Sequence, residues 1–205
     1  MITIVDYGMG NLRSVAKALE HLGASATLTS DPGEIARAEK LVLPGVGACG
    51  AAMTELKRRQ LVEPIRQAIG SGTPYLGICL GLQLLFESSE EAPGVAGLGL
   101  LAGTVKKFRD SSLKVPHMGW NQINRPETSD IRHQRLLEGI PDGSYCYFVH
   151  SYYAEPSDQT LVALRTAYGM PFASMVARER LFATQFHPEK SQAVGLRLLE
   201  NFIKL

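Results

Sequence analysis

Short apolar runs alternate with segments of helical periodicity through the first half of the chain, and this alternation limits the possible folds more than any other feature. Residues 12–22 and 51–69 carry apolar side chains at helical spacing. The apolar runs around them have the length of buried strands: 2–5, 26–29, 41–43 and 75–78. Strands and helices in alternation favour parallel pairing through right-handed crossovers. We therefore predict an α/β fold built on a doubly wound, mostly parallel sheet flanked by helices.

Glycine and proline residues mark the expected ends of these elements. Gly23 follows the first helical segment, at a position where a left-handed cap is favoured. Residues 31–33, Asp-Pro-Gly, are expected to form a turn after the second strand. The helix over 51–69 is expected to be interrupted near Pro64, and another helix is expected over 80–86, directly after the fourth strand.

The second half of the chain has a different pattern. Several of its predicted strands follow one another too closely for a crossover helix: 100–105, 145–149, 161–165, 173–176 and 181–186. Tightly joined strands pair antiparallel, so we predict a partly antiparallel extension of the sheet, followed by a helix over 192–202. The chain has no internal repeat or Pro/Ser-rich linker, and 205 residues suit one domain. We predict a single domain over 1–205.

Composition argues against several classes of protein. Lys and Arg number 21 and Asp and Glu number 20, a formal net charge of +1, so the basic footprint of a nucleic-acid-binding protein is missing. No apolar run approaches the roughly eighteen residues of a membrane-spanning helix, and the first residues do not resemble a signal peptide. The three cysteines lack metal-binding spacing and favour a reducing compartment. We expect a cytoplasmic protein with no nucleic-acid partner, no membrane partner and no metal site.

The string GICLG, residues 77–81, is the most informative part of the sequence. A strand runs directly into a helix there, and Cys79 has a glycine two residues to either side, the pattern of a nucleophile elbow with Cys in place of Ser. Cys79 is expected at the carboxyl edge of the sheet, beside a helix N-terminus that favours the thiolate. The N–H of Leu80 would point at the oxygen of an attacked carbonyl. Cys49 and Cys146 lack this context, and we expect them to be small buried side chains.

A nucleophilic cysteine needs a base, and His187 is the preferred candidate. It follows a predicted strand, and Pro188 and Glu189 come next, so the carboxylate could accept the second N–H of the imidazole and fix its tautomer. His150 is the rival candidate, because it also ends a strand, but its nearest carboxylate is Glu155. The remaining histidines are predicted to be structural or solvated: His21, His117 and His133.

The loop over residues 45–50 spells GxGxxG, which by itself would suggest a dinucleotide site. It follows the third strand rather than the first, and no acidic residue ends a further strand about twenty residues later. We therefore expect no dinucleotide cofactor. If this loop lies beside the carboxyl end of the Cys79 strand, its backbone N–H groups can bind a developing oxyanion.

Taken together, three strings resemble the class I, or triad-type, glutamine amidotransferases and occur in that family's order: PGVG (44–47), GICLGLQLLF (77–86) and QFHPEKS (185–191). Further strings resemble the glutaminase subunits of imidazole glycerol phosphate synthases: VDYGMGNLRSV (5–15), VPHMGWN (115–121) and FVHSYY (148–153). The resemblance covers nearly the whole chain. It implies hydrolysis of glutamine to glutamate and ammonia without a cofactor.

The resemblance also implies roles for individual residues. Cys79 would attack the side-chain amide of glutamine, His187 would transfer protons, and Glu189 would orient His187. The substrate would lie against a set of residues from three segments: Gly45, Val46, Gly47, Leu80, Gln83, His150, Ser151 and Tyr152. In this family the PGVG peptide is thought to reorient before its N–H can serve the oxyanion, which would make glutamine hydrolysis slow without a partner.

The partner implied by the resemblance is a cyclase subunit with a (β/α)₈ barrel, which would form a heterodimer with this chain. It would receive the ammonia through a channel and use it to form imidazole glycerol phosphate in histidine biosynthesis. Three residues match positions near that interface: Trp120, Tyr147 and Lys190. Enclosure of the product has a physical reason, because ammonia in neutral water is mostly ammonium, which is not a nucleophile.

Four alternatives remain open from the sequence. The chain could serve another class I amidotransferase, or act as a stand-alone cysteine amide hydrolase of the same fold. A non-catalytic binding module would have no need of Cys79, His187 and Glu189 together. A dinucleotide-dependent oxidoreductase would require the 45–50 loop to bind a cofactor.

Overall fold

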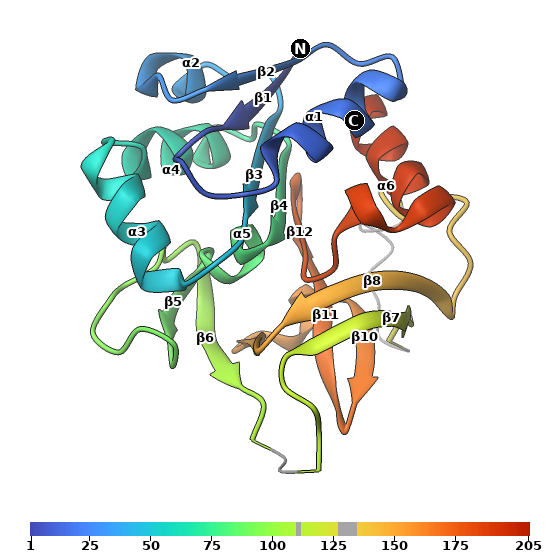
Figure 1. Cartoon of the computed structure of the whole chain (residues 1–205). Helices are drawn as coiled ribbons and strands as arrows, with labels where there is room; N and C mark the ends of the chain where they lie inside the picture. Colours follow the sequence, from blue (N-terminus) through green and yellow to red (C-terminus); the bar gives the residue numbers. More distant parts are fainter. Residues whose placement is uncertain (110–111, 127–134) are drawn as a thin grey trace.

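A ten-stranded sheet and a separate two-stranded sheet form the framework of the protein in residues 1–109, 112–126 and 135–205, the part that the computed structural model describes (Figure 1). His133 lies outside the described residues. The large sheet has the strand order β2-β1-β3-β4-β12-β11-β9-β6-β5, and β10 pairs with β11 beside this path.

The first five strands of this order are parallel. They are β1 (Ile2–Val5), β2 (Ala26–Thr29), β3 (Leu41–Gly45), β4 (Tyr75–Cys79) and β12 (Leu181–Thr184). Their carboxyl ends therefore meet at one edge of the sheet. The prediction of a doubly wound, mostly parallel sheet is confirmed.

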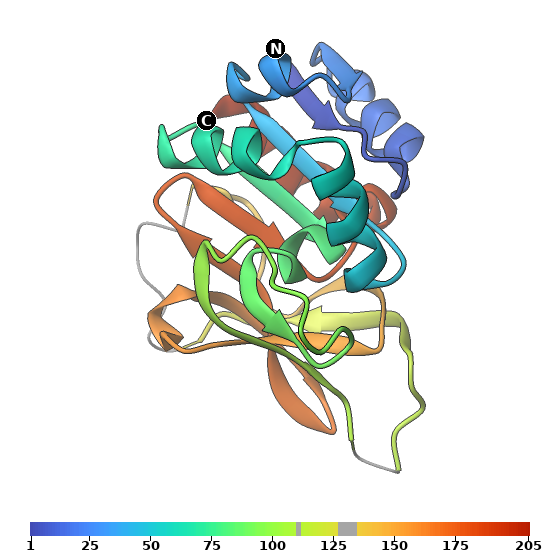
Figure 2. The same ribbon diagram turned by 90° about the vertical axis from the view of Figure 1, so that its left-hand side faces the viewer.

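Helices cover both faces of the parallel strands. Helices α1 (Leu12–His21) and α6 (Gln192–Lys204) pack on one face, and α2 (Pro32–Ala36), α3 (Cys49–Arg58) and α4 (Val62–Gly70) pack on the other. Figure 2 shows α3 and α4 lying across the strands. Successive strand residues join the two cores in alternation, because their side chains point to opposite faces. The continuous apolar runs of the sequence follow from this double burial.

The second half forms the predicted antiparallel extension. Strand β11 (Met170–Arg178) pairs antiparallel with β12, β10 (Val162–Tyr168) and β9 (Tyr152–Pro156). Beyond β9 lies β6 (Leu101–Lys107), antiparallel to β9 and parallel to β5 (Phe86–Ser89).

The two-stranded sheet lies across this extension. Strands β7 (His117–Ile123) and β8 (Ser144–His150) pair antiparallel in it. Short 3-10 turns, η2 (Gln159–Leu161) and η3 (Pro188–Lys190), complete the described elements together with α5 (Leu80–Gln83).

Three expected boundaries are wrong, each for a local reason. Residues 31–33 begin α2 instead of a turn, because the Asp31 side chain accepts a hydrogen bond from the Glu34 N–H at 2.8 Å and caps the helix. The break between α3 and α4 lies at residues 59–61, whereas Pro64 sits in the first turn of α4, where its missing N–H has little cost. The helix expected over 80–86 is the single turn α5, and Phe86 begins β5.

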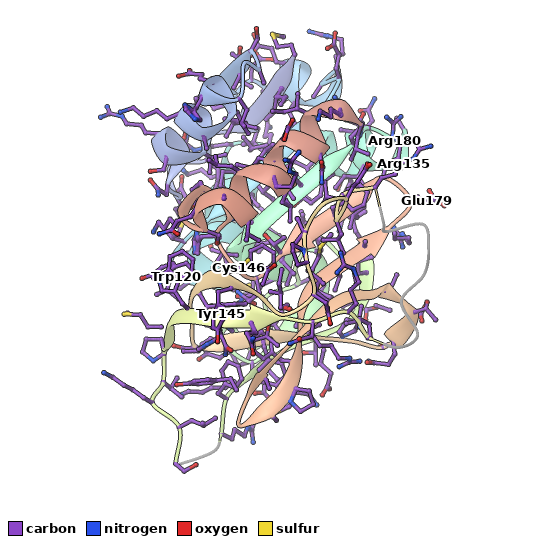
Figure 3. The ribbon with its side chains drawn as sticks, turned by 90° about the vertical axis from the view of Figure 1, so that its right-hand side faces the viewer. Trp120, Arg135, Tyr145, Cys146, Glu179 and Arg180 are labelled. Carbon is purple, nitrogen blue, oxygen red and sulfur yellow. The ribbon has the colours of Figure 1, made fainter. Side chains whose placement is uncertain are left out.

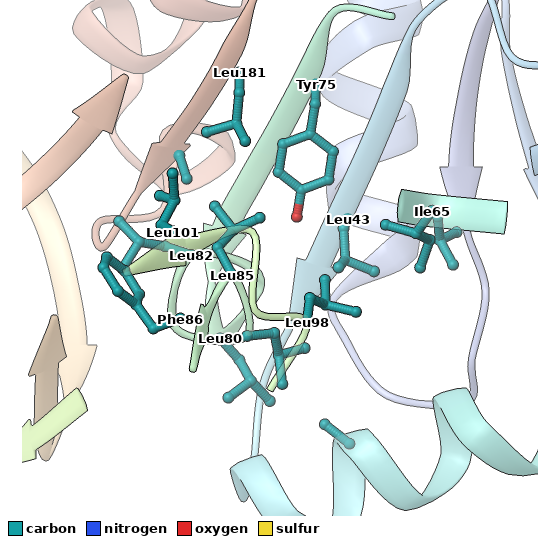
Figure 4. Close-up of a cluster of buried hydrophobic side chains, with 14 of the residues drawn as sticks. Leu43, Ile65, Tyr75, Leu80, Leu82, Leu85, Phe86, Leu98, Leu101 and Leu181 are labelled. Atoms are coloured by element: carbon teal, nitrogen blue, oxygen red, sulfur yellow. The ribbon is translucent and has the colours of Figure 1, made fainter. Parts of the chain in front are cut away.

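The turn α5 is held in place by the core on the α3–α4 side of the sheet. Leu80 and Leu82 pack in the same buried cluster as Leu43 of β3 and Tyr75 of β4 (Figure 4). The Tyr75 hydroxyl also donates a hydrogen bond to the carbonyl oxygen of Gly81 at 3.1 Å. These contacts fix the position at which β4 ends and Cys79 is presented.

Candidate active site

Cys79 stands at a strained turn between β4 and α5. Its φ of 55° and ψ of −103° are rare for a residue with a side chain. The flanking glycines permit the turn: a Cβ on Gly81 would lie 1.9 Å from the Leu43 carbonyl oxygen, and one on Gly77 would lie 2.7 Å from the Gly81 carbonyl oxygen. The elbow predicted from GICLG is therefore present, and its glycines are required by close backbone approach.

The other two cysteines have the expected structural environment. Cys49 and Cys146 are buried, and burial raises the pKa of the Cys49 thiol and raises that of Cys146 to about 12. A thiol with a raised pKa is a poor nucleophile at neutral pH.

His187 and Glu189 form a buried pair next to Cys79. The Nδ1 atom of His187 lies 2.9 Å from Oε1 of Glu189, and the two side chains are 2% and 1% exposed. Burial by itself lowers the pKa of His187, but interactions with Cys79 and Glu189 outweigh burial and raise it to about 9. The remaining ring nitrogen, Nε2, is buried without a partner at hydrogen-bond distance among the described residues. The site thus brings together a thiol, an imidazole and a carboxylate, the three kinds of group that a cysteine triad uses.

Backbone contacts hold the His187 segment against β8. The His187 N–H donates to the Tyr147 carbonyl oxygen at 3.0 Å. The Ser191 hydroxyl accepts from the Tyr147 N–H at 3.0 Å and donates to the His187 carbonyl oxygen at 2.7 Å. The imidazole is thus positioned by both its own carboxylate partner and the neighbouring strand.

The PGVG loop lies beside the Cys79 turn. Gly45 pairs with Cys79 in the parallel register of β3 and β4, which confirms that the loop adjoins the carboxyl end of the Cys79 strand. A Cβ on Gly45 would lie 2.8 Å from the Leu80 Cβ, and Gly47 has a φ of +92°. Close packing and a positive φ therefore explain both glycines.

A cavity of about 350 Å³ opens above Cys79. It is lined by seven of the eight residues expected to contact substrate: Val46, Gly47, Leu80, Gln83, His150, Ser151 and Tyr152. The eighth, Gly45, supports the loop and is not part of the lining described for this cavity. A volume of this size accommodates a small amino-acid substrate.

Sequence reasoning missed three residues that line the cavity. Pro116, Val149 and Glu91 complete its wall. Glu91 brings a carboxylate there, and its Oε2 accepts a hydrogen bond from the Cys49 N–H at 2.7 Å. Glu91 lies in the β5–β6 connection beside another glutamate, and no pattern in the sequence distinguishes it from a solvated acidic residue.

His150, the rival base, has both ring nitrogens engaged elsewhere. Its Nδ1 lies 2.7 Å from the Tyr152 carbonyl oxygen and its Nε2 lies 2.9 Å from Nδ1 of His117. Burial lowers the pKa of His150 to about 3 and that of His117 to about 4. Neither imidazole has a free nitrogen to accept a proton from Cys79, since Nε2 of His117 also lies 3.2 Å from the Asn121 amide. The geometry favours His187.

The three residues expected at a partner interface lie together on the surface. The rings of Trp120 and Tyr147 meet edge to face with centroids 6.1 Å apart, and Nζ of Lys190 lies 5.8 Å from the Tyr147 ring centroid. Trp120 is 47% exposed, and Figure 3 shows it on the β7–β8 sheet with Tyr145. Met118 is also exposed on this sheet. We call Met118, Trp120, Tyr145 and Tyr147 the β7–β8 face.

In residues 1–109, 112–126 and 135–205, no three His, Cys, Asp or Glu side chains are grouped so that they could hold a metal ion. No helix within these ranges has the length and apolarity to span a bilayer.

Comparison with known proteins defines the class to which this fold and site belong. The family described as "Glutamine amidotransferase class-I" matches residues 3–205. A solved glutamine amidotransferase has the same fold, with a TM-score of 0.76 at 18% identity, covering 100% of this chain and 98% of that chain. The Trypanosoma brucei CTPS glutaminase domain with bound acivicin has a TM-score of 0.68 at 17% identity, covering 99% and 93%. The chain belongs to the class I glutamine amidotransferase family.

Curated relatives narrow the assignment within this family. "Imidazole glycerol phosphate synthase subunit HisH" of Rhodopirellula baltica is 53% identical, over 98% of this chain and 96% of that protein. The HisH subunit of Moorella thermoacetica is 52% identical, over 100% of this chain and 94% of that protein. Within the family, the chain therefore falls among the HisH glutamine amidotransferase subunits.

Proposed function

We propose that the chain, acting as one domain over residues 1–205, hydrolyses glutamine through a thioester on Cys79 and supplies the ammonia to a cyclase subunit. The observation that carries the proposal is the buried His187–Glu189 pair beside a cysteine held at a strained strand–helix turn. Nucleophilic catalysis needs this set of groups: a sulfur, a proton acceptor within reach and a carboxylate that orients the acceptor.

The reaction proceeds in two halves. The Cys79 sulfur attacks the side-chain carbonyl carbon of glutamine, His187 having taken the thiol proton. The C–N bond then breaks as the imidazolium returns a proton to the leaving nitrogen, which gives ammonia and a glutamyl thioester. Water attacks the thioester with His187 as base, the C–S bond breaks, and glutamate leaves. Glu189 stabilises the imidazolium in both halves, because a carboxylate at 2.9 Å favours the charged ring.

Backbone N–H groups stabilise the oxyanion of both tetrahedral intermediates. Leu80 follows the nucleophile at the start of α5, and its N–H is one donor. The peptide following Val46 in the PGVG loop supplies the second donor. Reorientation of this peptide upon partner binding makes hydrolysis dependent on the complex.

Two side chains in the cavity suit the amino-acid end of glutamine. Glu91 supplies a carboxylate for the α-ammonium group, and Gln83 supplies an acceptor oxygen, since its amide nitrogen is already used by two other acceptors. The segment containing Ser151 and Tyr152 offers backbone groups to the α-carboxylate and α-ammonium. These contacts favour a free amino acid over a peptide-bound glutamine.

The names of the HisH relatives imply a second subunit, and we propose that it is a (β/α)₈-barrel cyclase forming a heterodimer with this chain. The β7–β8 face supports this proposal, because it exposes apolar and aromatic side chains on two strands, one of which reaches the cavity. Val149 of β8 lines the cavity, so the face and the site share a wall. Trp120, Tyr147 and Lys190 would border the ammonia path.

The test is a glutamate-release assay on the chain alone and after co-purification with a candidate cyclase, with and without the cyclase's nucleotide substrate. We expect slow hydrolysis alone and a steep rise when both are present. Cys79→Ala is expected to abolish glutamate release and leave complex formation intact. Turnover near wild type in Cys79→Ala would refute the thioester mechanism, and brisk turnover by the free chain would identify a stand-alone hydrolase instead.

A further inference from the structure

Gln185 is a fully buried polar side chain that reaches the proposed nucleophile. It directly follows β12, two residues before His187, and is 0% exposed. Its Nε2 lies 3.6 Å from the Sγ of Cys79. The mechanism derived above leaves this amide without a role.

The orientation of the Gln185 amide follows from a backbone carbonyl. The Tyr152 carbonyl oxygen can only accept, so the Gln83 atom 3.0 Å from it is the amide nitrogen. That same nitrogen lies 3.1 Å from the Gln185 side chain, which must present its oxygen there. The nitrogen of Gln185 therefore faces Cys79. This assignment follows from the hydrogen-bond network as a whole.

A second contact of the sulfur, with a backbone carbonyl, cannot favour its anion. The Val149 carbonyl oxygen lies 3.9 Å from Sγ and can accept from a thiol but offers nothing to a thiolate. Gln185 offers an N–H, and a donor to an ionised group makes a stronger hydrogen bond than a donor to a neutral one. Gln185 therefore offers the sulfur an uncharged donor in addition to the His187 imidazolium.

We propose that Gln185 is a catalytic residue that donates a hydrogen bond to the Cys79 sulfur and stabilises its thiolate, with its amide locked in the donating orientation by Gln83 and the Tyr152 carbonyl. This inference deepens the proposed function and rests on it. The bond is strongest while the charge is on sulfur. It weakens as the charge moves to the carbonyl oxygen during attack, and it re-forms when the C–S bond of the thioester breaks.

The hydrogen bonds that orient the Gln185 amide also connect the Cys79 sulfur to the substrate cavity. Gln83 lines the cavity and uses both amide hydrogens in the network, one toward Tyr152 and one toward Gln185. His150 donates to the same Tyr152 oxygen at 2.7 Å. The Tyr152 carbonyl oxygen, which determines the orientation of the Gln185 amide, therefore accepts two hydrogen bonds.

The test is the pH dependence of Cys79 alkylation by iodoacetamide in the full chain, followed by mass spectrometry of the Cys79 peptide. Gln185→Met keeps the side-chain length and removes the donor. We expect the midpoint of the profile to rise by about one pH unit, with a roughly tenfold slower reaction below the midpoint. Gln185→Glu places an acceptor beside the sulfur, and its midpoint is expected to rise further.

Ser174→Ala is the matched control. Ser174 is 0% exposed, its hydroxyl has no partner among the described residues, and its carbonyl accepts from the Gln185 N–H at 2.9 Å. Its alkylation profile is expected to match wild type. If Gln185→Met does not fold, Gln83→Met frees the Gln185 amide and is expected to raise the midpoint by less. A midpoint unchanged in every folded variant overturns the inference.

The result separates this inference from the proposed function. If Cys79→Ala abolishes glutamate release but the alkylation midpoint of Gln185→Met equals that of wild type, the function stands and the role of Gln185 fails. If Cys79→Ala retains glutaminase activity, the function fails whatever the alkylation profile shows.

Discussion

The backbone N–H of His187 donates a hydrogen bond to the carbonyl oxygen of Tyr147 at 3.0 Å. His187 is the proposed base, and the Tyr147 ring contacts both Trp120 and Lys190 on the surface. Because one residue joins the base to the exposed β7–β8 face, a partner that binds this face acts directly on the strand that holds His187. The geometry thus offers a physical route by which partner binding could influence the site.

Trp120→Ala is expected to weaken the complex with the cyclase by roughly tenfold or more in Kd, since an exposed aromatic at a docking face is a typical binding hot spot. Titration of the cyclase by calorimetry measures the change. Met170→Ala removes a similarly exposed apolar side chain from the start of β11 and should leave the affinity unchanged. Equal losses in both variants would argue against the β7–β8 face.

Glu189→Gln is expected to lower the rate of glutamate release less than His187→Ala does, because it disturbs the orientation of the base and leaves proton transfer possible. The Glu189 carboxylate also raises the pKa of His187, so the substitution should move the His187 titration to lower pH. NMR of the imidazole carbons follows this titration. An unchanged titration, or equal losses of rate, would contradict the orienting role.

Gly81→Ala is expected to destabilise the fold by more than about 3 kcal/mol, because the new Cβ would lie 1.9 Å from the Leu43 carbonyl oxygen and backbone would have to move. Urea denaturation measures the loss. Gly70→Ala is the control, since a Cβ there meets nothing within 4 Å and alanine suits the end of α4. A Gly81→Ala variant as stable as wild type would refute the steric account of the elbow.

Acid is expected to destabilise the protein through His117 and His150. In the folded protein the pKa of each imidazole lies below the ordinary value of 6.5. Their contribution to the free energy of unfolding is therefore complete above pH 6.5 and is lost as the pH falls toward about 4. The loss is about 1.4 kcal/mol per pH unit for each proton taken up on unfolding. The pKa of His187 is raised in the folded protein, so its contribution to the free energy of unfolding is complete below pH 6.5 and is lost as the pH rises toward 9. It therefore adds nothing to the acid loss.

Urea denaturation between pH 7.5 and 4.5 measures this dependence. His117→Gln removes one of the two titrating groups and is expected to flatten the acid slope by up to one proton. His21→Gln removes an exposed histidine of α1 and should leave the slope as in wild type. An acid slope unaffected by His117→Gln would contradict the assignment.

Much of the parallel half could be predicted because its signals are local. The runs at 2–5 and 26–29 coincide with β1 and β2, and Gly23 follows α1 with a φ of +81°. Strands β5, β7 and β9 were missed because they carry polar, glycine and proline residues at positions where a local pattern predicts loops. Their pairing partners, not their own composition, make them strands.

The residues of the site show the same difference between local patterns and contacts made only in the folded chain. Three short patterns have a geometry that is set within a few residues: the glycines around Cys79, the order His187-Pro188-Glu189 and the PGVG string. Because these patterns are local, the sequence by itself determined the family and the candidate triad. The contacts of Gln185, Glu91 and the His117–His150 pair join residues that are 33 to 106 positions apart. Only the tertiary structure decided them, because a buried polar side chain takes its partner from whichever strands the fold brings beside it.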